Sequence, residues 1–218
     1  MDPRDFALQH TMPTVMVPKF GAFERLQNAG HRLLMASNGI WIEAKRPGIY
    51  SRQQLSNALP VVTPYGAMTD EVTLGFQKIG SYVQQFVDYA RSNLPHEVAM
   101  ALIYNENEET VRFVLLPATS SSNAHITYAY PELLAGEHVV MDIHSHAEAQ
   151  AFFSSLDNAD DRGDVKVAIV VGKVDSSNPQ IKARLCTMGH YLPLPVSFTE
   201  NGQRVQFGGS HVPAHHSQ

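Results

Sequence analysis

The chain has few of the features that mark a secreted, membrane-spanning or nucleic-acid-binding protein. Its single cysteine, Cys186, cannot form an internal disulfide, and no apolar run approaches the roughly 20 residues that a membrane-spanning helix needs. The N-terminus is polar and has no signal-peptide core, so we expect a cytoplasmic protein with no membrane partner. There is no lysine- or arginine-rich run and the formal net charge is -5, which argues against a nucleic-acid partner.

What is present is the composition of a folded protein. Of the 218 residues, 44% are hydrophobic and 17% are charged, as in soluble globular proteins and unlike disordered ones. This length allows one domain of good size with a smaller attachment. The pattern along the chain predicts a small β-rich N-terminal region at residues 1–68, an α/β domain at 69–198, and a flexible polar tail at 199–218.

In the N-terminal region, one hairpin stands out. Ser37-Asn38-Gly39 lies between the alternating apolar runs 31–36 and 40–44, which is the strongest short-range signal for a β-hairpin. Trp41 is expected in the core of this small β unit. The first dozen residues and residues 45–67 carry prolines without a clear period, and they are expected to be irregular.

The following segment alternates between helical and strand patterns. Apolar residues at three- and four-residue steps predict a helix from about Asp70 to Asn93, with Thr69 as its N-cap. A serine-rich loop is predicted at 118–129 and a short helix near Ser154. One long helix, a mixed sheet and a short helix make this an α/β domain. The predicted strands are Val98–Tyr104, Val111–Leu116, Val139–His144, Val165–Val174 and Ile181–Met188.

Residues 144–157 contain a set of metal-binding side chains. His144 and His146 end a buried strand, and residues two apart on a strand point to the same side. Asp157 follows in the first turn of the predicted short helix. Two histidines and one aspartate leave one tetrahedral position open, as catalytic zinc sites do, so zinc is the expected cofactor. The pattern His-x-His-x(7)-Ser-x(2)-Asp arises by chance on the order of once in several hundred chains of this composition.

Several nearby residues also fit roles other than metal binding. Ser154 and Asp157 also fit a helix capping box, and both roles are compatible for Asp157 because a carboxylate has two oxygens. The acidic run of Asp160, Asp161 and Asp164 is predicted to be a solvated helix end rather than a second metal site. Cys186, in a predicted strand, is expected to be a buried apolar residue.

His144-Ser145-His146, Ser154 and Asp157 resemble the signature of the JAMM (JAB/MPN) metalloproteases, and the resemblance extends over roughly residues 70–190. It implies the JAB/MPN fold, a cytidine-deaminase-like mixed sheet flanked by helices. Members of this family cut after the C-terminal glycine of ubiquitin or ubiquitin-like proteins. The resemblance also implies a glutamate base at the start of the strand that follows the long helix, which assigns that role to Glu97.

A closer resemblance is to the prokaryotic JAB proteins of PRTRC systems, carried by residues 17–21, the hairpin, and residues 141–146 and 157–161. It implies a ubiquitin-like protein as substrate and a ThiF-type activating protein from the same operon as a further partner. The chain departs from the wider family at Ala147, where many members have proline. It also lacks the long insertion after Asp157 with which eukaryotic members grip ubiquitin, which argues against ubiquitin itself as the substrate.

The sequence therefore predicts a zinc-dependent peptidase or isopeptidase acting on a ubiquitin-like protein. Glu97 would take a proton from the zinc-bound water and deliver it to the leaving amine, and Ser154 would donate a hydrogen bond to the developing oxyanion. The serine-rich segment 119–128 is expected to pair as a strand with the substrate's tail. Two alternatives stay open: a non-catalytic JAB-like scaffold that binds such a protein, and a zinc hydrolase for a small amide.

Overall fold

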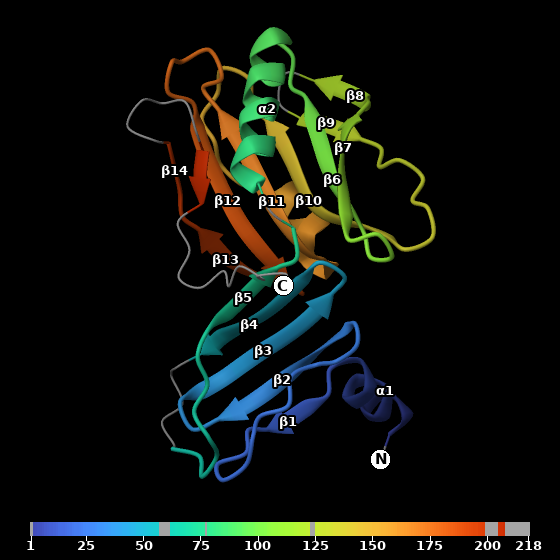
Figure 1. Ribbon diagram of the computed structural model, residues 1–218, viewed down its shortest axis with the longest axis vertical. Coiled ribbons are helices and arrows are strands. Elements are labelled where there is room, and N and C mark those ends of the chain that lie inside the picture. Colours follow the sequence, from blue (N-terminus) through green and yellow to red (C-terminus); the bar gives the residue numbers. More distant parts are fainter. Residues whose placement is uncertain (1, 57–61, 77, 123–124, 199–204, 208–218) are drawn as a thin grey trace. The chain divides into compact units, whose positions relative to one another are not determined.

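The computed structural model describes residues 2–56, 62–76, 78–122, 125–198 and 205–207. They form two compact units, one ending at Leu74 and one beginning at Gly75 (Figure 1). Each unit is built on a mixed sheet, helices are few, and the N-terminal part is rich in strands. This architecture confirms the predicted α/β class with a small β-rich attachment. Among the described residues, no helix is long and apolar enough to cross a membrane.

The first unit is a five-stranded sheet in the order β1-β2-β3-β4-β5, preceded by helix α1. The β2–β3 hairpin turns at Gly39, whose φ of 139° favours glycine, and confirms the hairpin prediction. Trp41 is 3% exposed and packs with Val17 and Leu34, as expected. The elements are α1 (Pro3–Thr11), β1 (Thr14–Met16), β2 (Gly30–Ala36), β3 (Gly39–Arg46), β4 (Ile49–Ser56) and β5 (Glu71–Leu74).

Two segments of this unit are more regular than the sequence predicts. The proline-bearing start forms α1, because Asp2 accepts a hydrogen bond from the Arg4 backbone N–H and Pro3 suits the first helical turn. Residues 45–67 are not irregular throughout, since β4 lies within them. Strand β4 buries the polar side chains of Ser51, Arg52 and Gln53, which conceals its strand period in the sequence.

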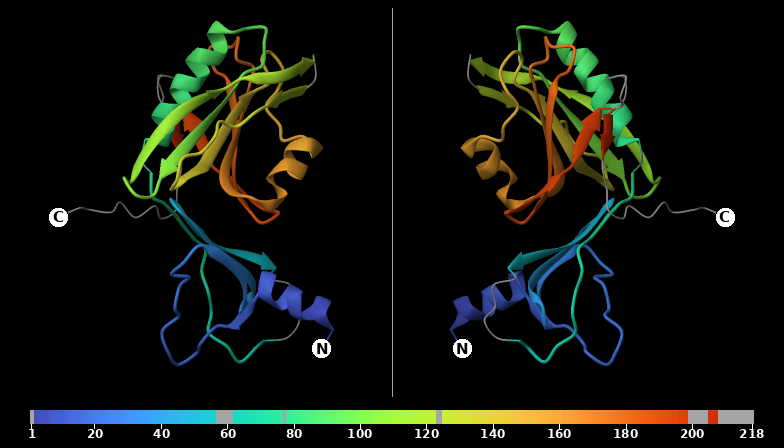
Figure 2. Two further views of the ribbon diagram at one scale, coloured as in Figure 1. Left: turned by 90° about the vertical axis from the view of Figure 1, so that its right-hand side faces the viewer. Right: turned by 90° about the vertical axis from the view of Figure 1, so that its left-hand side faces the viewer.

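The second unit is a six-stranded sheet in the order β13-β12-β11-β10-β6-β7. Its two central strands, β10 and β11, are parallel, and the other neighbours are antiparallel. Helices α2 and α3 lie on opposite faces of this sheet (Figure 2). The elements are α2 (Ile79–Ser92), β6 (Ala99–Asn105), β7 (Thr110–Leu116), β10 (Glu137–Ser145), α3 (Ser155–Asp160), the 3-10 helix η1 (Asp161–Gly163), β11 (Val165–Gly172), β12 (Gln180–Thr187) and β13 (His190–Leu194).

Helix α2 begins at Ile79, so the prediction that it starts near Asp70 is wrong. The segment Glu71–Leu74 pairs with β4 as strand β5 instead. Val72 in this segment and Phe76 after it happen to continue the apolar spacing of the helix. The predicted helix therefore extends too far toward the N-terminus. Within the observed helix the predicted period holds, because the buried residues are Val83, Phe86, Val87 and Ala90.

The five predicted strands of this unit are confirmed to within a few residues, and the short helix near Ser154 is α3. The serine-rich segment is not a loop: it forms a hairpin of β8 (Ala118–Ser122) and β9 (His125–Tyr128). The predicted flexible tail, 199–218, lies outside the described residues except for β15 (Val205–Phe207), which pairs with β14 (Val196–Phe198).

Candidate metal centre

Strand β10 delivers the two histidines to the end of the sheet. It lies between β6 and β11, with His144 opposite Ala99 on one side and Val170 on the other. His144 is consequently only 7% exposed. Ser145, between the histidines, accepts a hydrogen bond at Oγ from the Val98 backbone N–H at 3.0 Å, which agrees with its predicted role as a hydrogen-bonding residue rather than a catalyst.

The ring of His146 is oriented by the backbone that follows it. Its Nδ1 lies 3.0 Å from the Gln150 carbonyl oxygen, which can only accept, so Nδ1 carries the proton. This contact leaves Nε2 directed at Nε2 of His144, at 3.2 Å. A hydrogen bond from the distal nitrogen to a backbone carbonyl is the usual way in which proteins fix a metal-binding histidine.

Asp157 uses its two oxygens for two purposes. Oδ2 accepts a hydrogen bond from the Ser154 backbone N–H at 2.6 Å, and Ser154 Oγ accepts one from the Asp157 N–H at 3.1 Å, which makes the predicted capping box. Oδ1 lies 3.6 Å from Nε2 of His144. The cap thus fixes the carboxylate while one oxygen stays directed at the histidines.

These three side chains fit a divalent metal with nitrogen and oxygen ligands. One ligand atom from each of His144, His146 and Asp157 lies within 4.8 Å of the others. Ligands at about 2.0–2.1 Å from a tetrahedral zinc ion are about 3.3 Å apart, close to the observed 3.2 and 3.6 Å. Burial lowers the pKa of His144, although the negative charge of Asp157 acts in the opposite direction. The lowered pKa favours the neutral imidazole that a metal requires.

The loop after His146 is held tightly against the end of β11. The backbone N–H groups of Lys173 and Val174 donate to the carbonyls of Ala149 and Ala147 at 2.7 and 2.9 Å, and Ala147 adopts a φ of 46° to make this turn. Gly172, the last residue of β11, permits this approach. A Cβ at Gly172 would overlap the backbone of residues 149–151.

Replacing Gly172 with alanine is therefore expected to displace the loop and, with it, the Gln150 carbonyl that orients His146. We expect the free energy of unfolding to fall by about 1–3 kcal/mol, the usual cost of overpacking, and the affinity for added zinc to fall as well. Gly163→Ala is the matched control, because nothing lies within 4 Å of a Cβ there. Urea unfolding and zinc titration would measure both effects; equal behaviour of the two variants would contradict this account of the loop.

Glu97 lies two residues before β6, next to Val98, which contacts the end of β10. Val98 is bonded to Ser145 in both directions, through Ser145 N–H to the Val98 oxygen at 2.9 Å and Val98 N–H to Ser145 Oγ at 3.0 Å. The β6–β10 pairing ends at Ala99 and His144, and the Val98 N–H donates to the Ser145 side chain, so Glu97 lies just beyond the paired residues. Its role as the general base stays a prediction.

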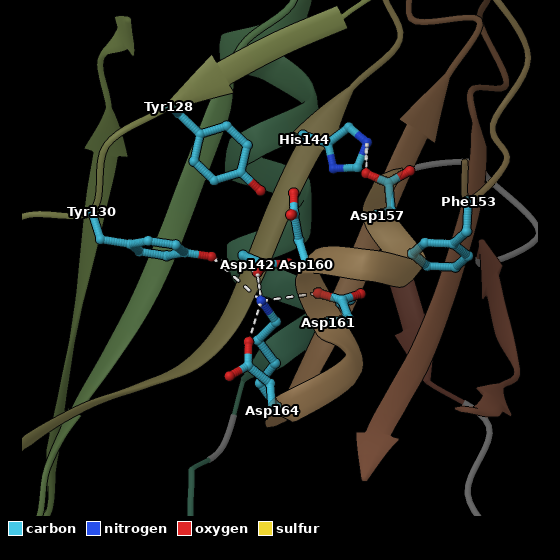
Figure 3. A pocket seen from close by; sticks show the side chains of 11 residues that line it. Tyr128, Tyr130, Asp142, His144, Phe153, Asp157, Asp160, Asp161 and Asp164 are labelled. Atoms are coloured by element: carbon cyan, nitrogen blue, oxygen red, sulfur yellow. Dashed lines mark hydrogen bonds and ion pairs between the residues drawn. The ribbon is translucent and has the colours of Figure 1, made fainter. Parts of the chain in front are cut away.

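A cavity of about 280 Å³ opens beside His144 and Asp157 (Figure 3). Tyr128 and Tyr130 lie on one side of it and Phe153 on the other. Burial raises the pKa of both tyrosines, so their hydroxyl groups stay protonated. The cavity therefore combines aromatic walls, hydroxyl groups and the open side of the ligand cluster.

The acidic run is only partly the predicted solvated helix end: Asp160 is exposed, but the prediction is wrong for Asp161. Asp161 is 4% exposed, because it lies between Lys166 at 3.0 Å and Arg184 at 2.6 Å. Lys166 also contacts Asp142 at 2.6 Å. The sequence contained a signal for this network: a lone charge interrupts each of two apolar strands, Asp142 in β10 and Lys166 in β11. Cys186 is fully buried, as predicted.

Comparisons with known proteins agree with the geometry. Residues 80–187 match the family model of prokaryotic homologs of the JAB domain, and residues 2–75 match a domain of unknown function, DUF2016. The chain thus contains a JAB domain of the prokaryotic type at residues 80–187. The pair of matches is consistent with the PRTRC-type JAB protein that the sequence resembles.

The remaining comparisons add little. A search of curated proteins gives no match. Among solved structures, the chain is similar to the solution structure of protein DSY2949 from Desulfitobacterium hafniense, with 14% identity and a TM-score of 0.37, over 63% of this chain and 95% of that one. A similarity this low supports no statement about fold or function.

Proposed function

We propose that this chain is a zinc-dependent peptidase or isopeptidase that hydrolyses the bond after the C-terminal glycine of a ubiquitin-like protein. The observation that carries the proposal is the convergence of His144, His146 and Asp157 in a JAB domain, where His144 and Asp157 also line a cavity. Three ligands of these types leave a coordination position free, which is the arrangement of catalytic rather than structural zinc sites. A JAB scaffold without catalysis would not need to keep all three.

The chemistry divides among the residues around this cluster. A zinc ion held by the three side chains would supply a Lewis acid and lower the pKa of a water molecule toward neutrality. Glu97 accepts the proton of the attacking water and delivers it to the leaving amine. Ser154 Oγ accepts the cap hydrogen bond from Asp157 N–H, so its own O–H proton remains available to donate to the oxyanion.

The β8–β9 hairpin offers the substrate's tail a route to this site. The β8–β9 hairpin leads directly into Tyr128, which lines the cavity. Among the described residues its sheet has two strands, so an extended chain can add to an outer edge through main-chain hydrogen bonds. A tail ending in two glycines is narrow enough to reach a recessed metal site, which is why we propose a ubiquitin-like protein. A ThiF-type activating protein is the proposed second partner.

The test uses a ubiquitin-like protein encoded in the same operon, fused at its C-terminus to a short peptide. Intact-mass analysis is expected to find one cut, directly after the terminal glycine, in the zinc-loaded protein. A fusion whose last two glycines are replaced by bulky residues is the control, and it should stay intact. Cleavage elsewhere, or equal cleavage of the control, would contradict the proposed specificity; tight binding without cleavage would favour the scaffold alternative.

A second variant tests the route of the tail. Deleting residues 120–123 shortens the hairpin without touching the metal ligands. The deletion is expected to raise KM more than it lowers kcat, because the hairpin contributes binding that is equal in the ground and transition states. A fall in kcat with KM unchanged would place the hairpin's contribution in the transition state instead.

A further inference from the structure

A buried lysine connects the elements that carry the metal ligands. Lys166, on β11, has a side chain that is only 7% exposed. Its Nζ lies 2.6 Å from Asp142 Oδ2, 3.0 Å from Asp161 Oδ1 and 2.9 Å from Asp164 Oδ2 (Figure 3). An ammonium group has three N–H donors, so one is available for each carboxylate.

One of the three carboxylates lies on the strand that carries His144. The other two lie directly after the helix that carries Asp157. Asp142 lies on β10 two residues before His144, and strand alternation puts both side chains on one face. Asp161 and Asp164 lie at the two ends of η1, which directly continues α3, and the first turn of α3 contains Asp157. The ammonium of Lys166 therefore links the strand of one ligand to the helix of another.

Helix α3 depends on such polar links, because it has little apolar packing of its own. It is six residues long and contains no buried residue. Besides the Lys166 contacts, Asn158 accepts a hydrogen bond at Oδ1 from Arg184 at 2.5 Å and one at its backbone oxygen from the Tyr191 hydroxyl at 2.6 Å. These Asn158 contacts attach α3 to β12 and β13. Lys166 ties the C-terminal end of α3 to β10, in addition to the contact between Asp157 and His144.

The lysine remains charged in this environment. Its burial acts to lower its pKa, but the charges of Asp142 and Asp161 outweigh that effect and raise the pKa above the ordinary value. Tyr130 completes the arrangement, since its hydroxyl donates to Asp142 Oδ2 at 2.8 Å. Removing the ammonium would leave three carboxylates close together with their shared counter-ion gone, and they would repel one another.

We infer that Lys166 is a positioning residue of the metal centre, which holds Asp157 at ligand distance from His144. This inference rests on the ligand set of the proposed function. The two histidines are fixed by β10 and the Gln150 carbonyl, so they keep their places without Lys166. Asp157 would move away with α3, and the centre would lose its third ligand.

The experiment compares two variants of the full chain. Lys166→Met removes the ammonium and keeps most of the side-chain volume. Glu137→Gln is the matched control, because Glu137 is a buried carboxylate on β10, the strand of Asp142 and His144. It lies at the opposite end of that strand and is bonded to Arg112 at 2.7 and 2.8 Å. Zinc affinity is measured by competition with a chelator, and the visible d–d bands of the Co²⁺-loaded protein report coordination geometry.

For Lys166→Met we expect zinc affinity to fall at least tenfold and the Co²⁺ bands to change, while Glu137→Gln binds like the wild type. Lys166→Arg, which retains the charge, should recover part of the affinity. If Lys166→Met does not fold, Asp142→Asn serves instead, since it removes the β10 charge that Lys166 and the Tyr130 hydroxyl contact and leaves Asp161 and Asp164 in place. Wild-type affinity and Co²⁺ bands in the folded Lys166 or Asp142 variant would overturn the inference. Full zinc binding by His144→Ala would overturn the ligand set itself, so the two failures are distinguishable.

Discussion

Replacing Glu97 with glutamine is expected to abolish turnover while leaving zinc content and folding unchanged. Glutamine has nearly the same shape, but its amide cannot accept the proton of the attacking water. General-base catalysis typically contributes a factor of roughly 100 to 10,000, so kcat should fall by about that much. KM should change little, because Glu97 acts on the water and not on the bound tail. Steady-state kinetics with the fusion substrate measure both quantities.

The control for this variant is the same substitution at a nearby exposed carboxylate. Glu148 is exposed and lies two residues after His146. Glu148→Gln should have wild-type kinetics. An active Glu97→Gln protein would move the role of base to another carboxylate, and loss of activity in Glu148→Gln alone would identify it.

The clustering of His144, His146 and Asp157 could be predicted from the sequence because its geometry is local. His144 and His146 share a face through strand alternation, and Asp157 is fixed within one turn by its capping box with Ser154. Neither relation depends on how distant segments pack. The same reasoning found α3 and the hairpin turn at Gly39, which also have local signals.

The residues around the ligands could not be predicted in this way, because they are brought together by strand pairing. Lys166 reaches Asp142 only because β10 and β11 are parallel neighbours in a register that sets Asp142 opposite Ala168. A charged residue in an apolar strand indicates burial with a partner, but not which partner. Strand β4 was missed for a related reason, since its buried polar residues are satisfied by contacts from other strands, such as the Arg52–Glu71 ion pair at 3.1 Å.

Removing a metal ligand is expected to have the largest effect on the metal content. Substitutions of residues that only orient ligands cost roughly 10- to 100-fold in metal affinity, and loss of a ligand itself should exceed that. His144→Ala and Asp157→Asn should therefore contain little zinc after purification and dialysis, and both should be inactive. Asp160→Asn, an exposed residue of the same helix α3, is the matched control and should retain about one zinc per chain.

The same ligands should also couple zinc to stability. A ligand that binds only the folded state stabilises it by about 2.7 kcal/mol at a free concentration 100 times its Kd. Added zinc should accordingly raise the Tm of the wild type and of Asp160→Asn, but not that of His144→Ala. Metal analysis gives the stoichiometry and thermal unfolding gives the coupling, so each checks the other. Full zinc occupancy in His144→Ala or Asp157→Asn, together with an undiminished rise in Tm, would show that the metal is held by other side chains.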